Sequence, residues 1–222
     1  SEICYSIGVS LLLADRYNEA LRWLEQCVKI KEDAGLLDEH YANAVYNTGV
    51  AYNYLGDFSK VTECMLAYID LGMEMYGEHS PEVAGAYSTL VGASLERNDY
   101  QGFREYTQKT LEILGNDKNA LLGSELSRFY INVATGYARL SDHSKARIYF
   151  EEAESIYNSE NLERDHNYIN LINSLAIVYG YLGLEQKQKE YYERGMELAV
   201  SSSSFLAFNL ITSVATELGR AG

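Results

Sequence analysis

The residues best suited to chemistry are few in this chain and lie far apart. The four histidines are His40, His79, His143 and His166, and each falls near a junction between predicted helices. Catalysis needs reactive groups that converge on one point, and histidines separated by whole helices do not converge. The sequence also lacks HExxH, paired CxxC, P-loop and GxSxG motifs. We therefore expect no catalytic residue, no metal site and no cofactor, and hence a protein that is not an enzyme.

The cysteines and the densest acidic cluster favour packing and solvation over chemistry. Cys4, Cys27 and Cys64 are odd in number and widely spaced, which is typical of small apolar packing residues and not of a disulfide framework or a metal site. Three glutamates lie on a predicted helix that also carries apolar residues at its packing face. We interpret these glutamates as a solvated face; they are Glu151, Glu152 and Glu154.

The charge balance excludes two classes of partner. The 18 Lys and Arg residues face 32 Asp and Glu residues, for a net charge of −14. Binding nucleic acid or an anionic membrane surface needs Lys and Arg, so neither partner is expected. No stretch is apolar enough to span a bilayer and no signal peptide is present. The cysteine pattern fits a reducing compartment, so we expect a cytoplasmic location. The chain opens at Ser1 inside a helix-like pattern, as a fragment of a longer protein would.

The elements that position these residues are predicted to be helices. The sequence holds one proline, Pro81, and long stretches rich in Leu, Ala, Glu and Tyr, which favour helix. Ser80 is a good N-cap and places Pro81 at the first helical position.

An internal repeat is the main pattern. Four stretches each open with a polar or charged residue, continue with a ring and then read as an amphipathic helix: RYNEALRWLEQCVKI, DFSKVTECMLAYIDL, DYQGFREYTQKTLEI and DHSKARIYFEEAESI. The ring positions are Tyr17, Phe58, Tyr100 and His143, and Glu185 takes this place in a fifth copy. They recur at intervals of 41, 42, 43 and 42 residues. Such a period indicates stacked helical units.

A second helix precedes each of these stretches. In it a small residue is followed three positions later by a larger one. The pairs are Gly8 and Leu11, Gly49 and Tyr52, Ala134 and Tyr137, and Ala176 and Tyr179. Two helices joined by a tight turn and repeated about every 42 residues predict an α-solenoid.

The pattern resembles the tetratricopeptide repeat family. The first repeat matches the family with Gly8, Ala20, Leu24 and Cys27, and the fourth with Ala134, Tyr137, Ala146, Phe150 and Ala153. Small residues let two helices approach closely, and aromatic rings fill the space between hairpins. The family period is about 34 residues, so the longer period here adds roughly one turn per helix. This spacing resembles kinesin light chains and Rap-type bacterial peptide receptors.

The resemblance implies an all-α solenoid of about five hairpins plus a C-terminal helix. We expect one superhelical domain over 1–222, with repeats near 1–37, 38–79, 80–117, 118–160 and 161–200. The last helix, 203–219, is either a cap or the first helix of a truncated sixth repeat. The other predicted helices are 2–14, 17–34, 38–55, 57–76, 80–97, 99–115, 119–140, 142–158, 162–182 and 184–200.

In this family the first helix of each hairpin lines a concave groove, which gives the candidate binding residues. They are Asn43, Tyr46, Asn47, Asn53, Tyr54, Arg128, Asn132, Arg139, Asn170, Asn173 and Tyr181. The same reasoning adds Tyr5, Val9, Leu12, Val50, Ser88, Gly92, Leu95, Ile131, Thr135 and Ile177. A carboxamide both donates and accepts, so asparagines along a groove can pair with the C=O and N–H of a peptide unit. Tyrosines between them supply contact area and a hydroxyl.

Two arginines leave their role open. The carboxylate clamp that some family members use is not expected, because Tyr5, Val9, Gly85 and Thr89 occupy its positions. Arg128 and Arg139 lie 11 residues apart on one predicted helix, about three turns. They either meet a carboxylate or phosphate of a ligand or neutralise acidic neighbours.

Two functions therefore stay open. The first is a scaffold that binds a protein or an extended peptide, neutral or basic because the chain is acidic, in its concave groove. The alternative is a ligand-sensing regulatory segment of a larger signalling protein. Self-association through the helix at 203–219 is compatible with either function.

Overall fold

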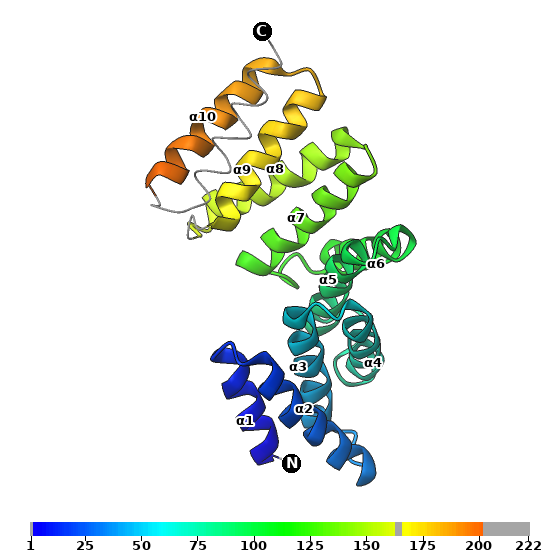
Figure 1. The fold of residues 1–222 in the computed structure, drawn as a ribbon. Helices are drawn as coiled ribbons and strands as arrows, with labels where there is room; N and C mark the ends of the chain where they lie inside the picture. Colours follow the sequence, from blue (N-terminus) through cyan, green and yellow to red (C-terminus); the bar gives the residue numbers. More distant parts are fainter. Residues whose placement is uncertain (1, 163–165, 202–222) are drawn as a thin grey trace. The chain divides into compact units, whose positions relative to one another are not determined.

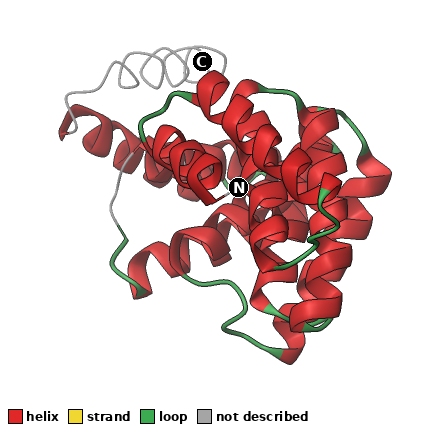
Figure 2. Cartoon of the chain, turned by 90° about the horizontal axis from the view of Figure 1, so that it is seen from below, coloured by secondary structure: helices red, strands yellow, loops and turns green. Residues whose placement is uncertain are grey.

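The computed structural model describes residues 2–162 and 166–201, and these residues form ten helices and no strand (Figures 1 and 2). The all-α fold of successive helical hairpins is thereby confirmed. The predicted helix at 203–219 lies outside the described residues. The helices are α1 (Glu2–Leu13), α2 (Tyr17–Asp33), α3 (Glu39–Leu55), α4 (Phe58–Tyr76), α5 (Pro81–Glu96), α6 (Tyr100–Asn116), α7 (Gly123–Arg139), α8 (His143–Ser159), α9 (His166–Tyr181) and α10 (Glu185–Ser201).

The second helix of every hairpin begins at the repeated ring position. These five first residues are Tyr17, Phe58, Tyr100, His143 and Glu185. In the middle three hairpins the preceding aspartate is the N-cap, and its side chain accepts a hydrogen bond from a backbone N–H in the first turn. The repeated polar residue therefore starts each of these helices by satisfying a backbone donor that has no partner within the helix.

The turn inside each hairpin has the same backbone conformation in all five copies. One residue before the N-cap, the chain adopts a positive φ, at Asp15 (56°), Gly56 (78°), Asn98 (55°), Ser141 (60°) and Gly183 (69°). Gly, Asn and Asp tolerate this left-handed conformation best, and four of the five residues are of these types. A single left-handed residue thus reverses the chain direction between the paired helices.

One helix begins later than the sequence predicts. The predicted helix 119–140 starts at Gly123, because Leu122 is extended and Gly123 has a φ of 54°. Ala120 and Leu121 are buried in the segment before it. These two apolar residues anchor the connection between hairpins and do not join the helix.

The chain divides into two compact units, residues 1–121 with α1 to α6 and residues 122–222 with α7 to α10. Within the first unit each helix packs on the next, and α1 also contacts α3. Within the second unit α7 packs on α8, α8 on α9, and α9 on α10. The single superhelical domain and its repeat boundaries stay predictions.

Small residues allow the close approach of paired helices, as the repeat pattern predicts. A Cβ on Gly8 would lie 2.7 Å from Cγ of Leu24, and a Cβ on Gly49 would lie 3.0 Å from Cβ of Cys64. In the second unit a core of Ala134 from α7, Phe150 from α8 and Leu175 from α9 joins three helices. In these hairpins the first helix is thus held by the face that carries the small residue.

Candidate functional site

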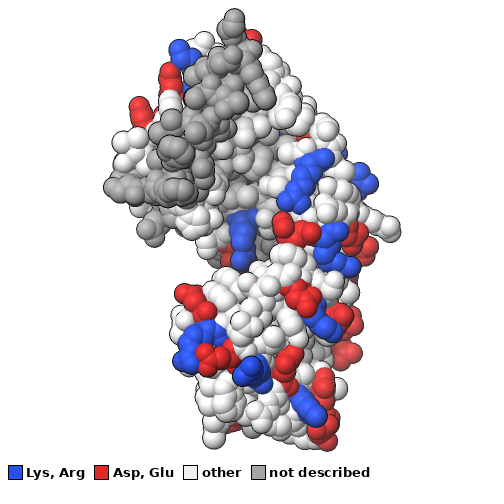
Figure 3. Space-filling view, viewed as in Figure 1, with Lys and Arg blue, Asp and Glu red and all other residues white. Residues whose placement is uncertain are grey.

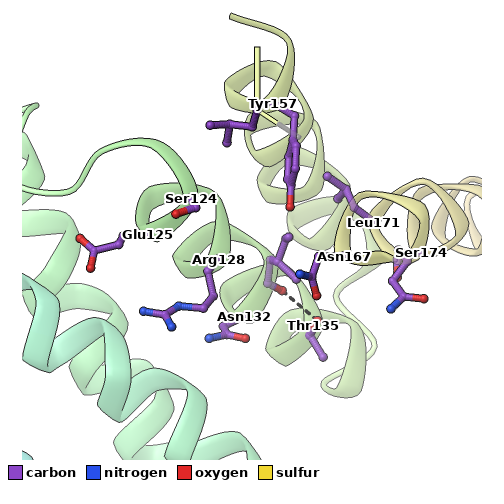
Figure 4. Close-up of a pocket in the computed structure, with 12 residues that line it drawn as sticks. Ser124, Glu125, Arg128, Asn132, Thr135, Tyr157, Asn167, Leu171 and Ser174 are labelled. Atoms are coloured by element: carbon purple, nitrogen blue, oxygen red, sulfur yellow. Dashed lines mark hydrogen bonds between the residues drawn. The ribbon is translucent and has the colours of Figure 1, made fainter. Parts of the chain in front are cut away.

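The second unit contains a pocket of about 780 Å³ between α7 and α9, which we call the α7–α9 pocket (Figure 4). It is lined by Ser124, Glu125, Arg128, Ile131, Asn132, Thr135, Tyr157, Leu162, Asn167, Asn170, Leu171 and Ser174. Figure 4 shows Arg128 and Asn132 extending from α7, on the opposite side from Leu171 and Ser174 of α9.

Helical periodicity explains why these residues share one face. Ser124, Arg128, Ile131 and Thr135 are spaced by three or four residues along α7, so they form one stripe. The α9 residues at 167, 170, 171 and 174 follow the i, i+3, i+4, i+7 pattern, which also places them on one face. Tyr157 near the end of α8 and Leu162 after it complete the lining between the stripes. The site is therefore built by the first helices of two successive hairpins.

Several polar groups of the pocket remain available to a ligand. Arg128, Asn132 and Asn170 form no side-chain hydrogen bond or ion pair with another residue that the structure describes. The Thr135 hydroxyl donates to the Ile131 carbonyl at 2.8 Å, and the Ser174 hydroxyl donates to the Asn170 carbonyl at 2.8 Å. Both hydroxyl oxygens can still accept a hydrogen bond. Together with the Glu125 carboxylate, the pocket thus offers one cation, one anion, two carboxamides and two hydroxyl acceptors.

The pocket brings together three of the predicted binding residues, Arg128, Asn132 and Asn170, and with them Ile131 and Thr135. Sequence reasoning missed the other members of the lining. Ser124, Glu125, Asn167, Leu171 and Ser174 could have been found by extending the same stripes. No repeat signal marks Tyr157 and Leu162, because they come from a second helix and a connection. The residues that it missed are Ser124, Glu125, Tyr157, Leu162, Asn167, Leu171 and Ser174.

The candidates on α3 lie in a different environment, where α1 packs against α3. The Asn47 amide donates to the Tyr5 hydroxyl at 3.2 Å and to the Asn43 carbonyl at 2.9 Å. The Tyr46 ring lies against Tyr68, with ring centroids 4.9 Å apart. Asn47 and Tyr46 therefore contribute to packing in the first unit, whereas Asn53 is exposed near the end of α3.

Two predicted tyrosines stack over the hairpin turns. Tyr54 lies parallel to Tyr17 and Tyr181 lies parallel to His143, with ring centroids 4.3 Å apart in both pairs. Tyr54 and Tyr181 are nevertheless 61% and 70% exposed. Each ring keeps one face open at the end of a first helix.

Four further candidates lie in other environments. Arg139 does not line the pocket and already interacts with another residue. Asn173 is half-buried, and its Oδ1 has no hydrogen-bond partner among the described residues. Ser88 and Leu95 are both only 3% exposed. The prediction that these last two residues face an open groove was wrong, because α5 is buried on most of its circumference.

Tyrosine–glutamate hydrogen bonds fix the hairpin that carries the pocket. The Tyr179 hydroxyl of α9 donates to Glu151 of α8 at 2.7 Å, and the Tyr191 hydroxyl of α10 donates to Glu154 at 2.7 Å. Burial and the neighbouring carboxylate raise the pKa of Tyr179 above its usual value. Glu154 also pairs with Arg194. It is 8% exposed, so its interpretation as part of a solvated face was wrong.

The same link occurs in the first unit. The Tyr41 hydroxyl of α3 donates to Glu32 of α2 at 2.8 Å, and Tyr52 donates to Glu25. Burial, together with the Glu32 carboxylate, raises the pKa of Tyr41 to about 12. Some of the many tyrosines therefore join the second helix of one hairpin to the first helix of the next.

The thiols and acidic groups show no reactive arrangement in the part of the chain that is described. Burial raises the pKa of Cys64 to about 11 and also raises the pKa of Cys27, so both thiols stay protonated near neutral pH. Among the described residues, no group of three His, Cys, Asp or Glu side chains is arranged to hold a metal ion. No described helix combines the length and the apolar character that crossing a membrane requires.

The fold and site define a helical-hairpin repeat protein, and comparison with known proteins agrees. The family model described as tetratricopeptide repeat matches residues 1–33, which contain α1 and α2. No curated protein matches the chain. The match to the family model is thus confined to the first hairpin of the chain.

Solved structures share this fold at low sequence identity. Tetratricopeptide-like repeats of a putative kinesin light chain from Podosopora anserina align with a TM-score of 0.69 at 16% identity, covering 91% of this chain and 95% of that one. A Rap protein complexed with competence and sporulation factor gives 0.68 at 15% identity, covering 92% and 55%. NprR in complex with its cognate peptide NprX gives 0.65 at 16% identity, covering 94% and 58%. At these identities the likeness shows the fold.

Proposed function

We propose that the chain binds an extended peptide segment of a partner protein in the α7–α9 pocket. The observation that carries the proposal is the pair of carboxamides, Asn132 and Asn170, that line the pocket from opposite helices without a partner among the described residues. Each carboxamide can donate to a peptide C=O and accept from a peptide N–H. Binding, and not catalysis, is the proposed activity.

The dimensions of the pocket suit such a ligand. The α7 stripe from Ser124 to Thr135 is about 16 Å long at about 1.5 Å per residue. An extended segment of about five residues covers that length at about 3.3 Å per residue. The volume of about 780 Å³ lies within the usual range for ligand sites. Ile131, Leu171 and Tyr157 add apolar contact area beside the polar groups.

Two solved structures of similar fold are complexes with a bound partner. NprR holds its cognate peptide NprX, and the Rap protein is complexed with competence and sporulation factor. The similarity lies in the fold, so these complexes support the class of ligand and not its sequence.

Selection from a phage-displayed random heptapeptide library on the whole chain tests the proposal. We expect enriched peptides that lose at least about tenfold in affinity for the double variant Asn132→Ala with Asn170→Ala, because two buried hydrogen-bonding groups of the complex disappear. Affinities are measured by titration with the synthetic peptides, and circular dichroism verifies that each variant keeps its helical content.

Two controls locate the site. The variant Asn18→Ala changes an exposed residue of α2 and should leave affinity unchanged. The variant Asn43→Ala with Asn53→Ala removes the same number of carboxamides from α3 in the first unit. Equal losses for the α3 pair and the pocket pair, or no loss for the pocket pair, would contradict the proposal.

A second candidate function is a sensor that passes ligand binding on to a further segment. It is favoured by the lengths of the similar chains, because this chain spans 55% of the Rap protein and 58% of NprR. Ligand binding would then shift the population of two conformations. Unchanged small-angle scattering of the chain upon saturation with a selected peptide would argue against this function.

A further inference from the structure

One acidic and one basic side chain line the α7–α9 pocket, and they do not form an ion pair with each other. Glu125 and Arg128 are the charged members of the lining, and both are exposed. They lie three residues apart on α7. Neither side chain forms an ion pair with the other or with another described residue. The pocket therefore presents a separate anion and a separate cation to whatever enters it.

The cation is particular to this hairpin. Counting six residues before the small residue of each first helix gives Glu2, Asn43, Gly85, Arg128 and Asn170 as equivalent positions. Only one of the five is basic. Packing of the repeat does not require an arginine here, since the other hairpins form with an acid, an amide or a glycine at the same place.

The structure distinguishes the two arginines whose role the sequence leaves open. Arg139 already interacts with another residue and lies outside the pocket. Arg128 lines the pocket and has no such partner among the described residues. Among the described residues no acidic side chain pairs with Arg128, which favours the other alternative, an anionic group of a ligand.

From this arrangement, and resting on the proposed function, we infer that the bound peptide segment is dipolar, with one carboxylate beside Arg128 and one basic side chain beside Glu125. The two residues are about 4.5 Å apart along the helix axis, and an extended segment advances about 3.3 Å per residue. The opposite charges of the ligand are thus expected one or two positions apart.

Electrostatics disfavours ligands that carry charges of only one sign. A segment with several carboxylates places one of them near Glu125 within a chain whose net charge is −14, and like charges at short range are unfavourable. A segment with only basic groups leaves Arg128 opposed to a cation. A dipolar segment satisfies both residues and remains neutral overall, in agreement with the neutral or basic partner that the composition predicts.

A charge-exchange variant provides the matched test. The double variant Glu125→Arg with Arg128→Glu keeps the net charge and the residue types but reverses the order of the charges. Heptapeptides are selected separately on the whole wild-type chain and on this variant. We expect acid–base pairs one or two positions apart to be enriched on the wild type and to appear in the opposite order, relative to the rest of the selected motif, on the variant.

Titrations with synthetic peptides then measure the energetic coupling between the acidic residue of the peptide and Arg128. Replacing the acidic residue of a selected peptide by its amide should weaken binding to the wild type by about threefold to tenfold, because the ion pair is partly exposed. The same replacement should have little effect on binding to Arg128→Gln, since the partner charge is already absent. Peptides with a free or an amidated C-terminus distinguish a side-chain carboxylate from a chain terminus.

The outcomes separate the two proposals. Peptides that depend on Asn132 and Asn170 but bind Arg128→Gln and Glu125→Gln as tightly as the wild type would overturn the dipolar ligand alone. An identical charge preference on the wild type and the exchange variant would do the same. Selections that yield no peptide dependent on Asn132 and Asn170 would overturn the proposed function, and the dipolar ligand with it.

Discussion

At the residue scale, the tyrosines explain how neighbouring hairpins are held in register. A tyrosine of a first helix packs its ring against the preceding hairpin and donates its hydroxyl to a glutamate there, as Tyr52 does with Glu25 and Tyr179 with Glu151. These two pairs occupy equivalent positions in different repeats. Hydrogen bonds to a carboxylate are stronger than those between neutral groups. Each link therefore stabilises the contact between two neighbouring hairpins and fixes their relative orientation.

The variant Tyr179→Phe tests this link. Removal of the hydroxyl leaves the ring buried but takes a donor from Glu151, so we expect a loss of about 1–2 kcal/mol in the free energy of unfolding. Urea denaturation followed by circular dichroism at neutral pH measures the loss. The control Tyr181→Phe removes an exposed hydroxyl while keeping the stack on His143, and it should change stability by less than about 0.5 kcal/mol.

The same variant predicts a pH dependence with a definite sign. The folded pKa of Tyr179 is raised, so its contribution is fully present below the unfolded pKa of about 10 and is lost as pH rises through the folded value. The stability gap between the wild type and Tyr179→Phe should therefore shrink above about pH 10. A gap that grows with pH in this range would show that the hydroxyl does not act through the carboxylate.

At the element scale, one hairpin design is repeated with local variation. Each copy has a turn residue with a positive φ, and its second helix begins two residues after that turn residue. A small residue of the first helix marks the place where the two helices pack closely. The design tolerates Ser141 at the turn and Val91 at the small position, as seen in the fourth and third hairpins. The elements therefore depend on a few contacts, which substitutions at glycine can test.

The pair Gly8→Ala and Gly85→Ala separates packing from backbone effects. A Cβ at position 8 meets Leu24 at 2.7 Å, whereas a Cβ at position 85 meets no atom within 4 Å. We expect Gly8→Ala to cost about 1–3 kcal/mol through overpacking and Gly85→Ala to add about 0.5–1 kcal/mol through helix propensity. Thermal unfolding of the two variants measures both effects, and a stabilised Gly8→Ala would refute close packing of α1 on α2.

At the scale of the whole molecule, much of the fold follows from the sequence because its determinants are local and repeated. Residues such as Phe58 and Tyr100 mark helix starts, since an aspartate caps the helix directly before each of them. Contacts between distant residues were not predictable in this way. Glu154 reads as a surface acid until the fold places Arg194 and Tyr191 beside it.

The candidate site was likewise predictable where it follows the repeat and not where it depends on contacts between distant residues. Arg128 and Asn132 were found because the family resemblance implies that the first helix of this hairpin lines the groove. Tyr157 belongs to a second helix and Leu162 follows it, so neither lies on the first helices that the family pattern marks, and this is why both were missed. Asn47 was placed on the correct helix, but the contact of α1 with α3 uses its amide for packing.

The charge of the molecule is consistent with a selective peptide site and not with general attraction of polyanions. On the face shown in Figure 3, acidic and basic side chains are interspersed on each unit, without a continuous basic patch. The formal net charge is −14. In the proposed function, recognition therefore rests on local groups such as those of the α7–α9 pocket.

We expect a bound peptide to lie between α7 and α9, and photo-crosslinking locates it. A benzophenone side chain replaces Ser124 in the pocket lining or, as a control, the exposed Ser144 on α8. Each 222-residue chain is irradiated with a library-selected peptide, and the products are identified by mass spectrometry. We predict a crosslinked peptide from position 124 that is lost when excess unlabelled peptide is added, and none from position 144. Crosslinks from position 144 alone, or equal crosslinks from both positions, would contradict the account.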